Sequence, residues 1–335
     1  MKAARFAGNG IVEIVEVPVP QIKENEILVK VSYCGLCGSE KRIVKNGFDK
    51  CIPGHEISGV IEKCGNMATQ YEPGTPVLVY LSNYCGTCEA CLKGNTSQCA
   101  HRRGLIGWSF DGGYAEYVAV PAHMIFPLGT LPVELGVLAL DTIGTAFHGL
   151  RQADITSDNS ALVIGCGPIG MGCLSILKNH YQVRKLYAAD ISPYHCQMAE
   201  KLGAVPIRVD PTDTVASIQN VLGEEKIDRV IEVCGIDATM AAAAKFVRAG
   251  GKIAFIGEPE KALTLVRSTD WVLKDFSLIN SWYFPISELT DNISYIKKYQ
   301  AEVSKLITNY YPLEQMTQAY AEFHSGNTGK VLIRM

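Results

Sequence analysis

The first 150 residues carry short apolar, β-branched segments that are separated by Gly and Pro. Segments of this kind, about four to eight residues long and bounded by turn residues, are typical of β-strands. A β-rich first domain is therefore predicted. Its expected strands span residues 11–17, 27–31, 57–61, 77–81 and 114–120.

After about residue 155, short apolar strands alternate with helical segments. Strands that alternate with helices of about ten to fifteen residues indicate βαβ units and a parallel sheet. The predicted fold class is α/β, a β-rich domain followed by a doubly wound parallel-sheet domain of the Rossmann type. The expected strands are 161–164, 185–189, 229–233 and 252–256, and the expected helices are 169–178, 193–202 (capped by Ser192) and 238–247.

The last fifty residues change pattern again. They predict helices at 287–299 and 313–323 and a final strand at 330–334. This tail is too short for a domain, so we expect it to complete the first one. The predicted domains are 1–150 together with 286–335, and 151–285.

Charge and composition exclude several classes of partner. The formal net charge is −3, from 31 basic and 34 acidic residues, and no basic run occurs, which argues against nucleic acid. The N-terminus lacks the apolar segment of a signal peptide, and we find no apolar run of about eighteen residues that would predict a membrane span. Twelve cysteines without an export signal fit a reducing, cytoplasmic compartment.

Four cysteines lie within fifteen residues, with gaps of two, two and seven residues between them: Cys85, Cys88, Cys91 and Cys99. Two-residue gaps let one loop wrap a zinc ion, and four thiolates fill its tetrahedral coordination sphere. The segment, about residues 84–100, is therefore predicted to be a lobe with a structural zinc. Ordinary buried cysteines and a disulfide framework are the alternatives.

A glycine-rich turn follows the expected strand 161–164 and opens a helix. It contains Gly165, Gly167, Pro168, Ile169 and Gly170. In a strand–turn–helix context this spacing is typical of dinucleotide binding, because the glycines allow a tight turn and close approach of the pyrophosphate to the helix N-terminus.

The acidic residue expected in such a site is Asp190, twenty residues after Gly170. Its carboxylate could bind both ribose hydroxyls of NAD and would repel the 2′-phosphate of NADP. The residues that follow it offer no arginine for a phosphate, and the nearest candidate is His195. A solvated strand-end carboxylate is the alternative interpretation.

Cys37 and the dipeptide His55–Glu56 lie in Gly-rich turns of the first domain. Thiolate and imidazole are good zinc ligands, and a catalytic zinc needs three protein ligands and an open position. Each residue alone is weak evidence, because a single buried Cys or His is more often structural.

Taken together, these motifs resemble the zinc-dependent medium-chain dehydrogenases, the superfamily of alcohol, sorbitol and threonine dehydrogenases. The resemblance spans essentially the whole chain and includes a GroES-like first domain. It rests on the segments 34–39 (Cys-Gly-Leu-Cys-Gly-Ser), 54–56 (Gly-His-Glu), 111–117 (Asp-Gly-Gly-Tyr-Ala-Glu-Tyr) and 329–332 (Gly-Lys-Val-Leu), and on the cysteine quartet and the glycine-rich turn.

The resemblance implies a catalytic zinc held by Cys37 and His55, with Glu56 as a ligand or a close neighbour. Asp141 falls at the position of the third ligand, and a lone carboxylate in an apolar run supports that role. The alternative for Asp141 is a hydrogen-bonded cap. Ser39 matches the first hydroxyl of the proton relay, whereas Arg42 replaces the histidine that many relatives carry. The expected cofactors are two zinc ions per chain and NAD.

For the substrate, the closest resemblance is to the polyol and polyol-phosphate branch, with Trp108 and Trp282 as candidate lining residues. Arg42 could bind an anionic group or could lie on a solvated basic face. Asp141-Thr142 departs from that branch, which leaves a threonine-like amino alcohol open. A non-catalytic NAD sensor is a third alternative. Relatives form dimers or tetramers, so a homo-oligomer is expected.

Overall fold

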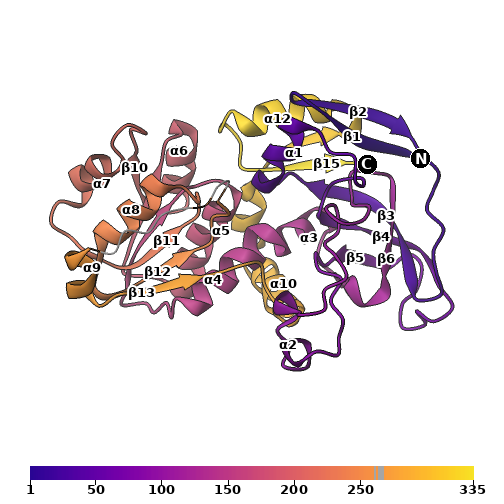
Figure 1. Cartoon of the computed structure of the whole chain (residues 1–335), viewed down its shortest axis with the longest axis horizontal. Helices are drawn as coiled ribbons and strands as arrows, with labels where there is room; N and C mark the ends of the chain where they lie inside the picture. Colours follow the sequence, from indigo (N-terminus) through magenta and orange to yellow (C-terminus); the bar gives the residue numbers. More distant parts are fainter. Residues whose placement is uncertain (260–261, 263–267) are drawn as a thin grey trace. The chain divides into compact units, whose positions relative to one another are not determined.

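The computed structural model describes residues 1–259, 262 and 268–335. Its contacts divide the chain into two compact units (Figure 1). The first unit contains residues 1–141, 284–325 and 330–335, and the second contains residues 142–283 and 326–329. The domains expected from the sequence differ from these units, because residues 142–150 and 326–329 were assigned to the first domain and belong to the second unit.

The first unit is built on a sheet of seven strands. Six of them lie in the order β14-β15-β3-β4-β5-β7, and the seventh, β6, pairs with β3. The pair β3 and β4 forms its centre, and β1 and β2 form a separate hairpin. The strands from the N-terminal part of the chain are β1 (Lys2–Gly8), β2 (Ile11–Glu16), β3 (Glu26–Gly35), β4 (Glu56–Cys64), β5 (Pro76–Val79), β6 (Tyr117–Pro121) and β7 (Ile125–Pro127).

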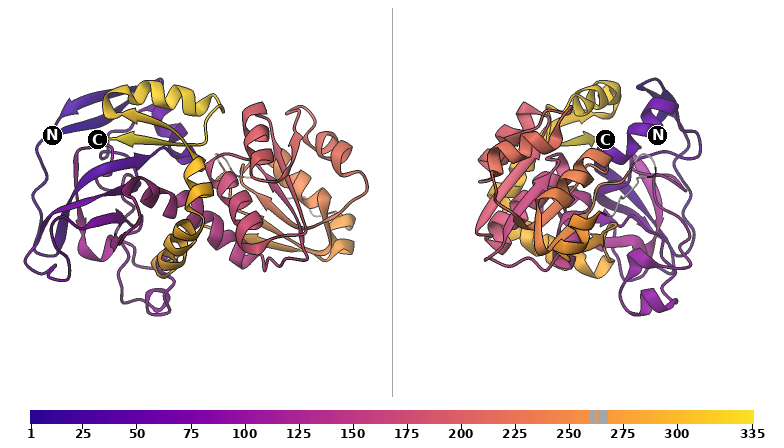
Figure 2. Two further views of the ribbon diagram at one scale, coloured as in Figure 1. Left: turned by 180° about the vertical axis from the view of Figure 1, so that it is seen from behind. Right: turned by 60° about the vertical axis from the view of Figure 1, so that its left-hand side comes forward.

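The end of the chain returns to this sheet, because β15 (Lys330–Arg334) pairs antiparallel with β3 and parallel with β14 (Ile307–Pro312). Figure 2 shows these yellow C-terminal elements beside the indigo N-terminal strands. The helices of the unit are short, and most join strands. They are α1 (Lys41–Asn46), α2 (Glu89–Leu92), α3 (Val133–Gly136), α10 (Leu289–Lys298), α11 (Gln300–Val303) and α12 (Met316–His324).

Within the described residues of the second unit, six strands form one parallel sheet in the order β10-β9-β8-β11-β12-β13. This is the doubly wound order, in which the direction of winding reverses between β8 and β11. The strands are β8 (Ser160–Ile164), β9 (Lys185–Asp190), β10 (Val205–Arg208), β11 (Ile227–Glu232), β12 (Val247–Phe255) and β13 (Ser277–Asn280).

Helices pack in two groups against this sheet, α4 with α5 and α6, and α7 with α8. Leu162 and Ile164 of β8 join the core beneath the second group, whereas Val163 points to the opposite face beside α5. Every residue of β8 is buried, as expected for a strand covered on both faces. The helices are α4 (Ala146–Gln152), α5 (Pro168–Ile176), α6 (Pro193–Lys201), α7 (Thr214–Leu222), α8 (Asp237–Phe246) and α9 (Thr269–Lys274).

The predicted α/β class, with a β-rich part and a parallel Rossmann-type sheet, is confirmed. Ser192 caps α6 by accepting a hydrogen bond from the His195 N–H. The predictions missed the strands β1, β7, β10, β13 and β14 and the helices α1, α2, α3, α4, α7 and α9 altogether. They also placed residues 114–116 in a strand, whereas β6 begins at Tyr117.

One segment corrects the expectation that no stretch is apolar enough to span a membrane. Residues Val133–Gln152 form a continuous helical run of 20 residues that meets the criterion of length and composition. Within its most apolar window, 83% of the segment is buried inside the protein. It is therefore a core helix.

Candidate functional site

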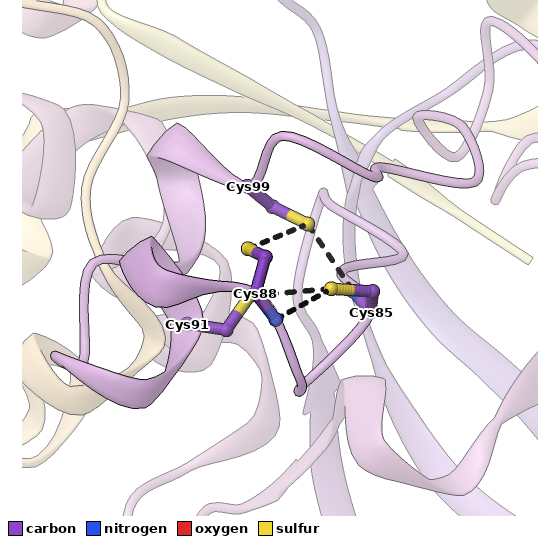
Figure 3. Close-up of side chains that lie close together, drawn as sticks. All are labelled: Cys85, Cys88, Cys91 and Cys99. Atoms are coloured by element: carbon purple, nitrogen blue, oxygen red, sulfur yellow. Dashed lines mark hydrogen bonds between the residues drawn. The ribbon is translucent and has the colours of Figure 1, made fainter.

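The cysteine quartet converges as predicted (Figure 3). The four residues come from one loop around α2 and the short turn Thr96–Gln98. Cys85 Sγ lies 3.9 Å from Cys91 Sγ, and Cys88 Sγ lies 3.9 Å from Cys99 Sγ. A tetrahedron with Zn–S bonds of about 2.3 Å has sulfur–sulfur edges of about 3.8 Å, so the four thiols fit zinc.

The backbone of the same loop stabilises the thiolate form. The N–H groups of Thr87 and Cys88 donate to Cys85 Sγ at 3.4 Å and 3.3 Å. These hydrogen bonds lower the pKa of Cys85 to about 5. Because zinc binds the thiolate, these N–H groups favour metal binding at Cys85. Cys91 differs, because burial raises its pKa to about 12.

A second cluster brings together four residues that are distant in sequence: Cys37, His55, Glu56 and Asp141, whose ligand atoms all lie within 4.8 Å of one another. Cys37 lies between β3 and the turn Gly38–Glu40, and Glu56 begins β4. Asp141 opens a π-helical turn (Asp141–Thr145). Such turns inside helices frequently mark functional sites.

Glycines allow the backbone to reach His55. The segments 52–54 and 112–114 run side by side, with the Gly113 N–H donating to the Gly54 carbonyl at 2.9 Å. Gly54 has a φ of +97°, and a Cβ on Gly112 would collide with the Gly54 carbonyl. The motifs Gly-His-Glu and Asp-Gly-Gly therefore pack against each other through their glycine backbones. This contact positions His55 at the cluster.

Asp141 Oδ2 is the centre of the second cluster, 3.4 Å from Cys37 Sγ and 3.3 Å from His55 Nε2. Burial alone would raise the pKa of Asp141, but the hydrogen bonds with His55 and Cys37 and the charges of His55 and Lys330 together outweigh burial and lower that pKa. Burial and the neighbouring Asp141 charge raise the pKa of Cys37.

The same cluster leaves buried oxygens without a partner. Asp141 Oδ1 and Glu56 Oε2 accept no hydrogen bond. Buried carboxylate oxygens without partners are costly unless a cation binds them. Sulfur, imidazole nitrogen and carboxylate oxygen form a mixed donor set that fits zinc. Only one of the four residues is a cysteine, so this cluster differs from the closed quartet.

A buried carboxylate that sequence reasoning did not identify, Glu40, lies directly behind the histidine. Glu40 Oε1 lies 3.2 Å from His55 Nδ1, so the other ring nitrogen, Nε2, faces the cluster. The hydroxyls of Tyr114 and Tyr320 donate to Glu40 Oε2 at 2.6 Å and 2.5 Å. A carboxylate behind a metal-ligating histidine fixes its tautomer and raises its basicity.

Lys330 supplies the positive charge behind Glu56. The Lys330 ammonium is buried and donates to Glu56 Oε1 and, at 2.9 Å, to the Leu36 carbonyl. Burial would lower the pKa of Lys330, but the charge and hydrogen bond of Glu56, together with the charges of Cys37 and Asp141, outweigh burial and raise that pKa. One oxygen of Glu56 is thereby held, and Glu56 Oε2 is left facing the cluster.

Two further predicted residues lie at this cluster. The Ser39 hydroxyl is 3.2 Å from Cys37 Sγ. The Trp108 ring stands 5.9 Å from the His55 ring, between centroids, and makes an edge contact with Phe48. Arg42 is exposed on α1, and Trp282 belongs to the second unit, where its ring contacts Tyr283. Their roles as substrate residues stay predictions.

The glycine-rich turn has the geometry that phosphate binding requires. Gly165 has a φ of +96°, and a Cβ on Gly170 would collide with the Gly165 carbonyl. Gly167 caps α5, and nothing lies within 4 Å of the point where its Cβ would stand. Pro168 and Ile169 form the first turn of that helix. The free N–H groups and the open space at Gly167 suit a pyrophosphate.

Asp190 ends β9 beside this turn. The Cys166 N–H donates to Asp190 Oδ2, and the Ser192 N–H donates to Asp190 Oδ1, each at 2.7 Å. His195 lies against the same carboxylate. Burial raises the pKa of Asp190, but these partners outweigh burial and lower that pKa, so a carboxylate faces the site.

Sequence reasoning missed the residues behind the ligands. Glu40 follows Cys37 by three positions, and a buried acid beside a predicted ligand could have been suspected. Tyr114 and Lys330 stood inside motifs that carried the resemblance, but nothing in their spacing assigned them a task. Tyr320 lies 280 residues from Glu40 and gave no signal.

Comparisons with known proteins agree with this geometry. Residues 23–130 match the alcohol dehydrogenase GroES-like domain, and residues 168–298 match the zinc-binding dehydrogenase domain. L-threonine 3-dehydrogenase of Bacillus velezensis is 30% identical over 95% of this chain and 94% of its own. The chain belongs to the zinc-binding medium-chain alcohol dehydrogenase superfamily.

Other members of the superfamily are similar over the full length. Galactitol 1-phosphate 5-dehydrogenase of Escherichia coli K12 is 29% identical over 99% of each chain. The solved structure of the alcohol dehydrogenase TADH from Thermus sp. ATN1 superposes with a TM-score of 0.92 at 25% identity and covers 100% of both chains. As a member of this superfamily, the chain is a zinc-dependent, NAD(P)-dependent alcohol dehydrogenase.

Proposed function

We propose that this dehydrogenase oxidises a secondary alcohol of the polyol, sugar-alcohol or polyol-phosphate class to a ketone, with NAD as hydride acceptor. The observation that carries the proposal is the buried cluster of Cys37, His55, Glu56 and Asp141, which offers donors of three chemical types. Cys37, His55 and Asp141 are the proposed ligands, and Glu56, held by Lys330 through its other oxygen, is the proposed neighbour. Three ligands leave zinc one position for a substrate oxygen. A sensor without catalysis would not need that open metal site.

In the proposed mechanism, Cys37, His55 and Asp141 would hold the zinc ion, with Glu40 behind His55 and Nε2 of that ring facing the metal position. A zinc ion held there would supply Lewis acidity to the hydroxyl oxygen of the alcohol and so lower the pKa of that hydroxyl. Ser39, whose hydroxyl lies 3.2 Å from Cys37 Sγ, accepts the alcohol proton. The nicotinamide of a bound NAD would supply the hydride acceptor.

The rest of the proton relay differs from that of the many relatives that carry a histidine at the next position of the relay after the first hydroxyl. Arg42 stands at that position, and a guanidinium stays protonated. Arg42 is exposed. We propose that ribose hydroxyls and water complete the relay beyond Ser39.

NAD is the proposed cofactor because Asp190 stands at the strand end beside the glycine-rich turn. Its carboxylate would accept hydrogen bonds from the ribose hydroxyls, and its charge opposes a 2′-phosphate. We also propose a cytoplasmic homodimer or homotetramer as the working form.

An amino alcohol of the threonine type is the second candidate substrate. The similarity to a threonine dehydrogenase over 95% of the chain favours it. The Trp108 ring beside His55 and its contact with Phe48 place an aromatic surface next to the metal ligands, which suits the carbon skeleton of either substrate.

A substrate panel tests the proposal. The zinc-loaded protein is mixed with NAD and with sorbitol, galactitol 1-phosphate, 2,3-butanediol or L-threonine, and NADH formation is followed at 340 nm. We expect the highest kcat/KM for a polyol or its phosphate. A kcat/KM for L-threonine at least tenfold above all polyols would replace the proposal with the amino-alcohol alternative. Arg42→Ala should weaken phosphorylated substrates more than neutral ones if Arg42 binds the phosphate.

A further inference from the structure

Both ring nitrogens of His195 face hydrogen-bond acceptors. Nδ1 lies 3.3 Å from Asp190 Oδ2, and Nε2 lies 3.0 Å from the Thr328 carbonyl oxygen. A neutral imidazole carries one proton and can satisfy only one of two acceptors, whereas an imidazolium satisfies both. The surroundings of His195 therefore select its charged form.

The acceptor on the far side is held in place by a second contact. Thr328 belongs to the segment Gly326–Gly329, which the contacts assign to the second unit. The Ser192 hydroxyl, at the start of α6, donates to the Gly326 carbonyl at 2.6 Å. Two hydrogen bonds from the first turn of α6 thus fix this segment, and the Thr328 carbonyl remains directed at the ring.

Asp190 is held equally firmly on the near side. Two backbone N–H groups, from Cys166 in the glycine-rich turn and from Ser192, donate to its two oxygens. The carboxylate cannot turn away from His195 without losing these bonds. The two charges therefore stay together beside the phosphate-binding turn.

We propose that His195 determines how strongly the enzyme distinguishes NAD from NADP. The protonated ring cancels the charge of Asp190, so the preference for NAD grows as the pH rises and the ring loses its proton. This inference rests on the proposed binding of a nicotinamide dinucleotide at residues 165–170 and Asp190.

The direction follows from the charges. With His195 protonated, the pair is neutral as a whole and repels a 2′-phosphate weakly. With His195 neutral, Asp190 alone faces the phosphate and repels it. Burial by itself would lower the pKa of His195, but the hydrogen bond and charge of Asp190 raise it, so the change occurs above the ordinary value of about 6.5.

Asp190 is the charged group that acts on the ring. Arg208, on the neighbouring strand β10, acts on Cys196 of α6 instead. The Tyr194 ring lies 6.1 Å from the His195 ring, between centroids. Lys178 lies beside Gly203, and Glu200 and Lys201 stand in the last turn of the helix, away from His195.

Equilibrium binding of the reduced cofactors tests the proposal without turnover. The Kd values of NADH and NADPH are measured by fluorescence between pH 6 and 9 for the wild-type enzyme, His195→Gln and His195→Lys. A phosphate monoester itself loses a proton near pH 6, so His195→Gln supplies the baseline at each pH. Thermal unfolding verifies that each variant is folded.

We expect the ratio Kd(NADPH)/Kd(NADH) of the wild-type enzyme to approach that of His195→Lys at low pH and that of His195→Gln at high pH. The separation between the two variants should be about tenfold, the effect of one charge near a phosphate in a solvated site. If His195→Gln does not fold, the test compares the wild-type enzyme with His195→Lys alone. The ratio Kd(NADPH)/Kd(NADH) of the wild-type enzyme should then rise above that of His195→Lys as the pH rises.

A wild-type ratio that stays parallel to either variant across the whole range would overturn the inference while leaving the proposed function intact. If neither NADH nor NADPH binds the wild-type enzyme at any pH, the proposed function fails as well.

Discussion

The two clusters of metal-binding residues in the first unit are built in opposite ways. The cysteine quartet occupies fifteen residues of one loop, and backbone N–H groups of that loop contact its sulfurs. The other cluster consists of Cys37, His55, Glu56 and Asp141 and is called the assembled cluster below. Its residues come from three distant segments, and further side chains lie behind them. A closed site can be local, whereas an open site needs the surrounding fold to hold its ligands.

The difference has an energetic cause. Four thiolates complete the coordination of zinc, so the quartet needs little beyond its own turns. The assembled cluster buries several carboxylates, which is costly without partners. Glu40, Tyr114, Tyr320 and Lys330 supply those partners, and each is buried.

Replacing a ligand of the assembled cluster should have the largest effect on activity. We expect Cys37→Ser to lower kcat/KM by at least about 10³-fold, because the Lewis acid is no longer held in position. The melting temperature should change by only a few degrees, and the zinc content should fall from two ions to one. Cys64→Ser, on β4 and outside both clusters, is the matched control. Full activity in Cys37→Ser would remove the site assignment.

Replacing a ligand of the quartet should act on stability instead. Cys88→Ser opens the closed site, and we expect the free energy of unfolding to fall, because the binding free energy of a structural metal contributes to folding. Urea unfolding and metal analysis measure this. The kcat of the protein that remains folded should stay within about twofold of wild type. A large loss of kcat in fully folded Cys88→Ser would show that the quartet is not purely structural.

Glu40→Gln separates the clusters through a residue that binds no metal. The neutral amide is a poorer acceptor for His55 Nδ1, so zinc affinity at the assembled cluster should fall about 10- to 100-fold. Chelator competition measures both sites in one protein, and the d–d spectrum of the cobalt-substituted enzyme should shift. Glu13→Gln, an exposed position in the same unit, should change neither. Equal weakening of both sites would mean a general loss of structure.

Sequence reasoning was effective where the information is local. The spacing of the quartet and the strand–turn–helix context of Gly165–Gly170 are contained in short segments, and both have the expected geometry. The alternation of strands and helices predicted the parallel sheet for the same reason. The strands β10 and β13, at the edges of the described sheet, are only four residues long and were missed, because so short a segment gives a weak pattern.

The rest depends on contacts between segments that are far apart in sequence. The segment Gly326–Gly329 returns to α6, so the carbonyl facing His195 comes from more than 130 residues away. Tyr320 reaches Glu40 across 280 residues. No period or spacing encodes such pairs, because they arise from the way the whole chain packs. The resemblance supplied the ligands of the assembled cluster but not the residues that hold them.

The smallest expected effect is also the most specific test of the comparison. Tyr320→Phe removes one of two hydroxyls that donate to Glu40 Oε2, while Tyr114 remains. One lost hydrogen bond to a charged group, partly compensated by the other, should cost about 1 kcal/mol, or roughly fivefold in zinc affinity at the assembled cluster. The matched change at the quartet is Thr87→Ala, which removes a hydroxyl 3.6 Å from Cys85 Sγ but keeps the backbone N–H. We expect no change there, because the main chain holds that sulfur. If Thr87→Ala weakens its site as much as Tyr320→Phe weakens the other, the distinction between a site held by its own backbone and one held by distant side chains is wrong.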